Sequence, residues 1–350
     1  NLQMGDTKIG DYLEFRHDRP SQMGYFNDSI DITANFDQTI LNTNELEYFV
    51  PEFKRLNQQV SLDGLFKGRV NSFYSDEFTL GIGEKTKMAG SIDIEGLPDI
   101  EKTFFSLQLE NSTVNAEDIN QYLTERFRSL IRKLGTVKMD AQFDGLLDNF
   151  VADGQFVTAI GNINSNVKIE LPENELPKYD GDLEVKNFDL GYFSGDTTFQ
   201  KLDMQGAIQG EGFQLKNANF SLVANVPKIG ILQYEYTNIE TDGSFKQSFF
   251  SGEVSINDPN LKFFANGSID LRNENEILKI RGVLDTALLH DLKLTEEYVM
   301  IASNIDLDID GLQIDSIQGQ AKLSDSKIKY KNKELSISSL DFSSDRKANN

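Results

Sequence analysis

The sequence predicts a mainly β protein whose strands pair in an elongated, antiparallel sheet. Apolar and polar residues alternate one by one over short segments, for example at residues 91–94 and 304–310. Side chains on a strand point alternately to its two faces, so this period of two gives each strand one apolar and one polar face. Such segments recur from residue 12 to residue 342 without helices alternating between them. That order favours antiparallel pairing over a βαβ fold.

The expected strands are short and evenly spaced, and Gly, Asn and Asp mark the turns between them. In chain order they cover residues 11–15, 29–36, 60–73, 77–83, 87–95, 104–110, 137–150, 156–171, 181–188, 204–209, 218–224, 230–243, 252–256, 261–271, 277–284, 300–314, 316–330 and 335–342. Strands of this kind make a sheet with one continuous apolar surface, and something must cover that surface.

One amphipathic helix is expected at residues 115–134. Its apolar stripe consists of residues at helical spacing, chiefly Ile119, Leu123, Phe127, Leu130 and Leu134. Asn115 followed by Asp118 resembles a capping box, and Gly135 suits the C-terminal end. We expect this helix to cap or plug one open end or side of the sheet. A shorter helix is expected at residues 44–49, before Pro51.

A faint internal repeat relates two segments of the chain. The pattern Asp63, Phe66, Gly68 and Phe73 recurs at the same spacing as Asp140, Phe143, Gly145 and Phe150. Phe and Gly are common here, so coincidence is the alternative. A repeated strand unit suits an elongated sheet in which each part contacts mainly its neighbours. We therefore interpret residues 1–350 as one segment of a repeat-like sheet, with sub-units expected at 1–59, 60–136, 137–272 and 273–350.

The composition disfavours several classes of partner and site. With 56 acidic against 34 basic residues, the net charge is -22, the opposite of the field that nucleic acid or an anionic lipid headgroup requires. Cysteine is absent, which removes disulfides, thiolate metal sites and cysteine nucleophiles. No run approaches the roughly 18–20 apolar residues of a membrane-spanning helix. Because residue 1 is Asn rather than Met, we expect a processed or excised piece of a longer chain.

Residues that commonly carry catalysis are scarce. The two histidines, His17 and His290, stand alone in the sequence, and we interpret both as loop or surface residues. Neither a nucleophile elbow nor a phosphate-binding loop is present, and the glycine-rich residues 206–212 are interpreted as strand and turn. A carboxylate pair for glycoside hydrolysis stays an alternative, although tryptophan, on which sugar-binding clefts rely, is absent. We expect neither an enzyme nor a cofactor.

One segment opens like a calcium-binding loop. Asp306, Asp308 and Asp310 precede Gly311, but the closing Glu would fall at position 317, which is Ile317, and the positions between are apolar. We interpret the three acids as the polar face of one strand. No metal site is expected.

Several short segments, in their order and spacing, carry a family resemblance. They are residues 96–103, residues 143–150 with Thr158 and Gly161, residues 236–239 with Asp242 and Gly243, residues 257–261 and residues 267–270. Over about residues 60–282 the sequence resembles the translocation and assembly module proteins (TamB) of the Bacteroidota, within the AsmA-like group.

The resemblance implies a periplasmic protein of the cell envelope, anchored in the inner membrane by an N-terminal helix and extending toward an Omp85-class outer-membrane barrel (TamA-like). It implies a sheet curled into a U-shaped, β-taco-like groove with an apolar lining. Such a groove conducts or shields phospholipid between the two membranes, or supports outer-membrane protein assembly. We do not recognise the anchor or the barrel-proximal domain in these 350 residues, which fits an internal fragment.

The apolar face is therefore the candidate functional surface. We expect it to be lined by Ile92, Ile94, Met139, Phe143, Val167, Ile169, Leu171, Leu183, Val185, Leu222, Val254, Ile256, Ile269, Leu271, Ile305, Leu307 and Ile309. An acyl chain lying there gains about 0.8 kcal/mol per buried methylene. Two alternatives stay open: the same residues close on themselves as a sandwich or solenoid core, or the protein is a scaffold whose edge strands pair with client outer-membrane polypeptides.

Overall fold

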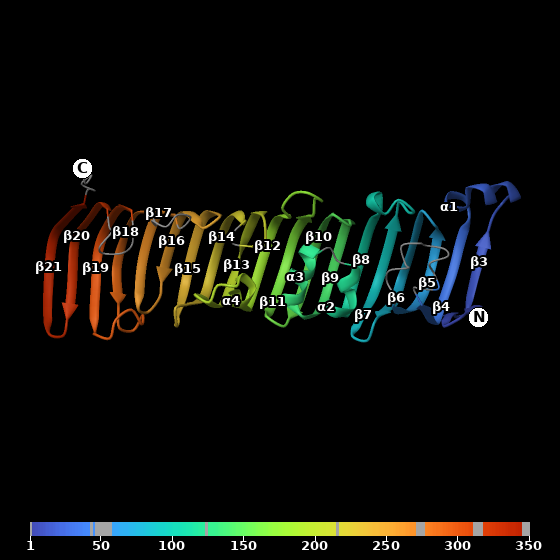
Figure 1. The fold of residues 1–350 in the computed structure, drawn as a ribbon, viewed down its shortest axis with the longest axis horizontal. Coiled ribbons are helices and arrows are strands. Elements are labelled where there is room, and N and C mark those ends of the chain that lie inside the picture. Colours follow the sequence, from blue (N-terminus) through green and yellow to red (C-terminus); the bar gives the residue numbers. More distant parts are fainter. Residues whose placement is uncertain are drawn as a thin grey trace, which may run out of the picture. The chain divides into compact units, whose positions relative to one another are not determined.

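The computed structural model describes residues 2–42, 45, 58–122, 125–214, 217–270, 277–310 and 318–344. The chain forms two compact units, Asn1–Glu173 and Asn174–Asn350. Both units are mainly β, and their strands follow one another antiparallel (Figure 1). The predicted fold class is confirmed, while the finer division into four sub-units stays a prediction.

Unit 1 contains eleven described strands. From β4 to β11 each strand pairs with the next, while β2 and β3 both pair with β4 and β1 pairs with β2. The strands are β1 (Leu2–Met4), β2 (Thr7–Ile9), β3 (Tyr12–Arg16), β4 (Asp31–Asn42), β5 (Gln59–Arg69), β6 (Ser72–Ile82), β7 (Thr86–Glu95), β8 (Phe104–Asn115), β9 (Thr136–Leu146), β10 (Asn149–Thr158) and β11 (Gly161–Glu170). The short helices before β8 are η1 (Pro20–Tyr25), α1 (Phe26–Ser29) and η4 (Ile100–Lys102).

Unit 2 contains ten described strands, each paired with the next. They are β12 (Lys178–Asp189), β13 (Phe199–Glu211), β14 (Asn219–Ile231), β15 (Tyr234–Lys246), β16 (Phe249–Asn257), β17 (Leu261–Asp270), β18 (Ile277–Leu288), β19 (Val299–Asp310), β20 (Gln318–Tyr330) and β21 (Lys333–Ser344), with the helix α4 (Leu190–Ser194) after β12. Within the described residues no ladder joins the first and last strand of either unit, so both sheets are open.

Four predicted strands, at residues 60–73, 137–150, 156–171 and 230–243, each span a turn between two strands in the structure, and two of them are instructive. Residues 137–150 form parts of β9 and β10 around a two-residue turn at Leu147 and Asp148, and residues 230–243 form parts of β14 and β15 around a turn at Leu232 and Gln233. Neither turn contains the Gly or Asn that marks most two-residue hairpins. The apolar alternation therefore ran through both turns without a visible break.

β-bulges bend the strands of both units. In unit 1 the register shifts in each of the five successive pairs from β4–β5 to β8–β9, and a bulge bends its strand and increases the local twist. At the β8 bulge Asn111 has a φ of 46°, and its N–H donates to the carboxylate of Asp140 at 2.6 Å. The same arrangement occurs in unit 2, where the N–H of Asn187 donates to the carboxylate of Asp203 at 2.5 Å. Each unit is therefore a curved open sheet.

The predicted sequence repeat is also a structural repeat. Asp63 accepts the N–H of the bulge residue Gln38 at 2.6 Å, as Asp140 does from Asn111. Gly68 has a φ of 130° and pairs with Phe73 near the start of β6. Gly145 in β9 has a φ of 141° and pairs in the same way with Phe150 of β10. The rings in the two hairpins lie 6.3 and 6.2 Å apart, in the pairs Phe66–Phe73 and Phe143–Phe150.

The predicted helix at 115–134 is interrupted rather than continuous. It consists of α2 (Ala116–Ile119), the 3₁₀ helix η5 (Asn120–Tyr122) and α3 (Glu125–Leu134). Asn115 caps α2 by accepting the N–H of Glu117 at 2.9 Å. The predicted capping box is wrong, because the Asp118 carboxylate accepts instead the N–H groups of Lys85 and Thr86 at 2.9 and 2.7 Å. These two hydrogen bonds attach α2 to the β6–β7 turn.

The apolar stripe predicted for this helix is only partly described. Ile119 lies in α2 and Leu134 ends α3, and both are half-buried. Phe127 and Leu130 belong to α3 with side chains outside the described part, and Leu123 lies outside the described residues. The helix expected at 44–49 also lies outside them, except for Glu45.

Candidate functional site: the apolar face of each unit

The apolar residues of unit 1 line up in continuous rows across its strands. Directly paired residues lie side by side on the same face of a sheet. One row crosses β4 to β11 through Ile32, Gly68, Phe73, Ile94, Phe105, Gly145, Phe150 and Ile169. The next row crosses β7 to β11 through Ile92, Leu107, Phe143, Ala152 and Val167.

All the unit 1 residues predicted to line the surface fall on or beside this face. Five belong to the two rows, and Met139 lies two residues from Ala141 on the same face of β9, paired with Phe156. Leu171 follows the last residue of β11, and its N–H donates to the carbonyl of Asp148 at 2.7 Å. The predicted residues in the rows therefore share one face of the sheet, and their role in lining a groove stays a prediction.

Unit 2 has an equivalent face built from parallel rows. One row crosses β14 to β19 through Phe220, Phe245, Phe250, Ile269, Leu278 and Ile309. The next crosses β13 to β20 through Ile208, Leu222, Gly243, Gly252, Gly267, Ile280, Leu307 and Ala321. A third crosses β12 to β20 through Leu183, Gly206, Ala224, Thr241, Val254, Ala265, Gly282, Ile305 and Leu323.

The remaining predicted residues of unit 2 also belong to this face. Val185 pairs with Met204, and Ile256 pairs with Phe263. Leu271 lies outside the described residues.

Part of the unit 1 face is covered by the helical segment. Figure 1 shows α3 lying across β9 to β11, and the N–H of Ala159, in the β10–β11 turn, donates to the carbonyl of Leu134 at 2.9 Å. The fully buried apolar residues of these strands and β8 include Leu109, Val137, Ala141, Ala152 and Val167. We infer that α2 and α3 cover the apolar face here; that the helix caps or plugs an open end or side of the sheet stays a prediction.

The face of unit 2 is covered at β12 and β13 and open farther along. Next to α4, the rings of Phe188 and Phe193 are 5.2 Å apart, and Leu202 and Met204 are buried. On β15 to β20, the fully buried apolar side chains among the described residues are only the alanines Ala265 and Ala287. The larger members of the rows there are half-buried, including Phe245, Phe250, Ile269, Ile280 and Leu307. A closed core would bury them completely.

The opposite face of unit 2 is polar and charge-paired. Asp306 accepts from Arg281 at 3.1 Å and Asp308 pairs with Lys279 at 3.3 Å. The interpretation as the polar face of one strand is confirmed for Asp306 and Asp308, whereas Asp310, at the end of β19, is half-buried. No group of three metal-ligating side chains occurs among the residues that the structure describes.

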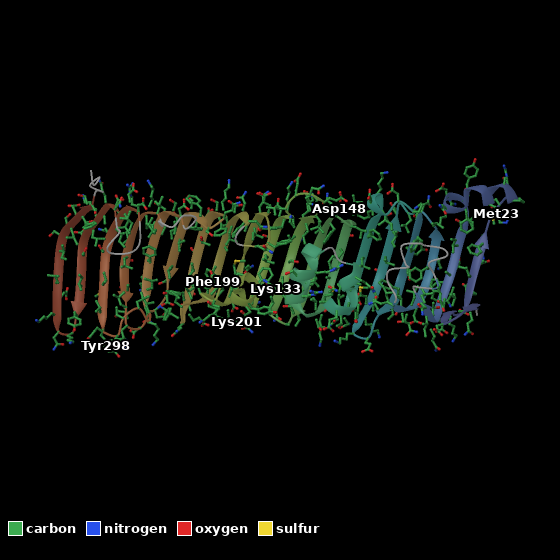
Figure 2. The ribbon with its side chains drawn as sticks, viewed as in Figure 1. Met23, Lys133, Asp148, Phe199, Lys201 and Tyr298 are labelled. Carbon is green, nitrogen blue, oxygen red and sulfur yellow. The ribbon has the colours of Figure 1, made fainter. Side chains whose placement is uncertain are left out.

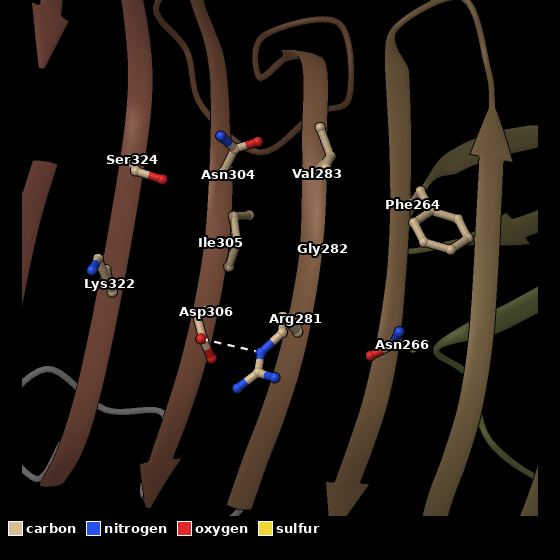
Figure 3. Close-up of a pocket in the computed structure, with 10 residues that line it drawn as sticks. All are labelled: Phe264, Asn266, Arg281, Gly282, Val283, Asn304, Ile305, Asp306, Lys322 and Ser324. Carbon is tan, nitrogen blue, oxygen red and sulfur yellow. Dashed lines mark hydrogen bonds and ion pairs between the residues drawn. The ribbon is translucent and has the colours of Figure 1, made fainter. Parts of the chain in front are cut away.

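A shallow depression of about 490 Å³ lies on this polar face across β17 to β20 (Figure 3). The exposed side chains of Phe264 and Val283 are direct cross-strand partners there. The Arg281–Asp306 pair and Lys322 lie beside them. The depression is open and of mixed polarity, and it does not interrupt the apolar rows on the other face.

The hairpin β16–β17 is held by a buried carboxylate. Asp258 is 1% exposed and accepts hydrogen bonds from the hydroxyl of Tyr234 (2.6 Å), the N–H and hydroxyl of Thr237 (3.0 and 2.8 Å) and the N–H of Asn260 (2.9 Å). Burial raises its pKa, but these hydrogen bonds together outweigh burial and the pKa is lowered. The pKa of Tyr234 is raised to about 12 by burial and by this bond. Residues 236–239 and 257–261, two segments of the family resemblance, thus meet here.

Several rows contain residues that the sequence interpretation left out. They are mainly aromatic or aliphatic side chains next to hairpin turns: Phe105, Phe150, Phe220, Phe245, Phe250 and Leu278. Four of them, Phe105, Phe150, Phe220 and Leu278, already lie inside predicted strands, and extending the patterns 230–243 and 252–256 by two residues reaches Phe245 and Phe250. The two histidines lie apart from the apolar rows. His17 is exposed, and His290 lies between β18 and β19 with its Nδ1 3.0 Å from the carboxylate of Asp291.

The comparisons with known proteins add no identification. No family model, curated protein or solved structure matches the chain. Among the described helices, none has the length and apolar character needed to span a lipid bilayer.

Proposed function

We propose that the apolar face of each unit binds phospholipid acyl chains and shields them from water. In this proposal the chain is a segment of a TamB-like protein of the AsmA-like group, located in the periplasm of the cell envelope and anchored in the inner membrane. It conducts or shields phospholipid between the inner and outer membranes, with an Omp85-class barrel as its outer-membrane partner. Support for the outer-membrane assembly pathway belongs to the same proposal.

The observation that carries the proposal is the half-buried state of the large apolar residues on β15 to β20. Phe250, Ile269 and Leu307 contact their neighbours in the rows but keep part of their surface accessible. Each methylene of a ligand that covers such surface contributes about 0.8 kcal/mol, so a few methylenes suffice for retention. The rows run across the strands, so an acyl chain lying along them passes from one strand to the next without meeting a charged side chain on that face.

A second candidate function rests on β21. This strand pairs with β20 along one edge, and within the described residues no strand pairs with its other edge. Its side chains Leu335, Leu340 and Phe342 are exposed, and its sequence contains no proline. A strand edge with exposed apolar residues is a template for another strand, which is the support for a scaffold that pairs with client outer-membrane polypeptides.

Photo-crosslinking separates the two functions. A photoreactive amino acid is placed at Leu307 on the apolar face, at its neighbour Asp308 on the polar face, and at Ser338 on β21. Because Leu307 and Asp308 are adjacent in β19, the pair differs in the face sampled and little else. Irradiation in cells is followed by mass spectrometry of the adducts.

The proposal expects phospholipid adducts at Leu307 and none at Asp308. Polypeptide adducts at Ser338 with no lipid at Leu307 would favour the scaffold. Lipid adducts of equal yield at Leu307 and Asp308 would contradict a face-specific lipid site.

A further inference from the structure

One edge of unit 2 carries exposed, large side chains on most of its turns. The connections after β12, β14, β16, β18 and β20 lie at the same edge, because successive strands run in opposite directions. Figure 2 shows Tyr298 at this edge, with Lys201 farther along it. The exposed residues are Tyr192, Leu232, Leu294, Tyr298 and Tyr330, and we call this set the tyrosine rim. Among the described turn residues of the opposite edge, none is a large exposed apolar side chain.

The turn that presents Leu232 has an unfavourable backbone for this residue. Leu232 and Gln233 have φ values of 47° and 73° in the two-residue turn between β14 and β15. Asn-Gly suits such a turn, whereas a bulky residue at positive φ is a genuine outlier. The Leu232 side chain is 64% exposed, so packing within the unit does not compensate the strain. The exposed Gln247 on the opposite edge has a similar backbone, with a φ of 49°, so the large apolar side chain is what sets Leu232 apart.

The tyrosine rim is held in place before any ligand arrives. The N–H of Leu232 donates to the carbonyl of Thr198 at 3.1 Å, which joins two neighbouring turns. The Tyr298 ring stacks on His290 with centroids 3.8 Å apart. Between the next two turns, Lys331 pairs with Glu297 at 3.9 Å. Pre-ordered side chains lose little entropy on binding.

Ion pairs line this rim, although its connections, like the chain as a whole, contain more acidic than basic residues. Four lysines near the rim have an acidic partner within 4 Å, in the pairs Lys201–Asp189, Lys228–Glu235, Lys329–Glu334 and Lys331–Glu297, and Lys293 lies in the turn that also contains Asp291, Glu296 and Glu297. Tyrosine and lysine, with apolar bodies and polar tips, settle at a membrane–water interface. An anionic surface recruits unpaired basic clusters, and the described residues of this rim contain no such cluster. A zwitterionic headgroup layer is therefore the lipid surface that fits the rim.

We propose that the tyrosine rim docks unit 2 on a zwitterionic phospholipid surface. Leu232 and Tyr298 enter the boundary between headgroups and acyl chains, and the paired lysines and acids remain among the headgroups. This docking is independent of acyl-chain binding on the apolar face, and it places the end of that face next to its lipid source.

The test is flotation of the purified chain with phosphatidylcholine vesicles. Leu232→Asn relieves the strained turn and removes the apolar side chain, so we expect a higher melting temperature together with about a tenfold lower vesicle partition coefficient, the factor expected from burying one leucine. Tyr298→Ser should also lower partition. The matched control is Gln247→Asn on the opposite edge, where Gln247 has a φ of 49° in a similar turn; it should raise the melting temperature and leave partition unchanged.

The outcomes distinguish the occupants of this surface. Wild-type protein that stays unbound, or Leu232→Asn protein that floats equally well, overturns the proposal. Binding that requires phosphatidylglycerol and disappears with salt overturns the choice of a zwitterionic surface. The wild-type protein could instead fail to float and form a dimer in sedimentation equilibrium that Leu232→Asn converts to a monomer. That result overturns the proposal and assigns the rim to contact with a second copy. Lipid retained by vesicle-free protein reports on the apolar face and should be equal in wild type and Leu232→Asn.

Discussion

Replacing Asp258 by Asn tests the buried carboxylate that holds β16–β17. Its Oδ1 accepts from Tyr234 and the N–H of Asn260, and its Oδ2 accepts from the N–H and the hydroxyl of Thr237. Asparagine replaces one of these oxygens by an NH₂ donor. The hydroxyls can rotate to find other partners, but one backbone N–H is left facing a donor whichever way the amide turns.

The expected cost of Asp258→Asn is about 3 kcal/mol. A stranded buried donor costs roughly 1–3 kcal/mol, and the remaining hydrogen bonds lose the strength that a charged acceptor gives them. Tyr234→Phe removes the hydrogen bond that the hydroxyl donates to Asp258 and the one that it accepts from the Asn260 side-chain amide at 3.1 Å, but it leaves the charge, so it should cost about 2 kcal/mol. The ordering of the two variants is therefore part of the prediction.

The assays are urea unfolding followed by circular dichroism and hydrogen exchange of the peptides containing Thr237 and Asn260. Asp258→Asn should lower the urea midpoint and speed exchange of these two amides before it affects unit 1. Because the pKa of Asp258 is lowered in the folded protein, its stabilisation is present above its unfolded pKa of about 3.9 and is lost as the pH falls through the folded value. The difference between wild type and Asp258→Asn should thus shrink below about pH 4. Unchanged midpoint and exchange at pH 7 would refute the reasoning.

Two further predictions concern the curved sheet of unit 1. Gly145→Ala should lower the melting temperature, at a cost of about 1–3 kcal/mol in stability, because Gly145 has a φ of 141° and a Cβ would lie 2.7 Å from the Cα of Phe150. The control is Gly24→Ala, which has open space around it and should leave the melting temperature unchanged. Asp140→Ala should cost about 1–2 kcal/mol in urea unfolding because it removes the acceptor of the Asn111 N–H, and a variant as stable as wild type would show that this bond does not support the bulge.

The sequence was sufficient for the mainly β, antiparallel fold and for grouping the apolar residues of the rows on one face, although several predicted strands span a turn. This succeeded because a period of two is a local signal: Ile305, Leu307 and Ile309 each face the same way whatever strand lies beside them. The repeat succeeded for a similar reason. Asp140 and Gly145 recur because each performs a local backbone task, accepting a bulge N–H or passing close to the next strand.

The features that escaped prediction depend on contacts between distant residues. The bulge at Asn111 is completed by Asp140, 29 residues away, and Asp118 caps the turn at Lys85 rather than its own helix. The turn at Leu232 lacks the residues that its backbone favours, so no turn signal marked it. Whether an apolar face is covered also depends on tertiary arrangement, as the contrast between β9 under α3 and the open β19 shows.

The most direct test of the central claim is the lipid content of the purified chain. Native mass spectrometry and solvent extraction should find phospholipid bound in the mild detergent-free preparation. A variant with Leu307→Asp and Ile280→Asp, which places two charges in adjacent positions of one apolar row, should retain less, while Asp306→Leu on the polar face should retain as much as wild type. Wild-type protein free of lipid, with Leu307 and Ile280 as protected from solvent labelling as the buried Leu109, would contradict the account.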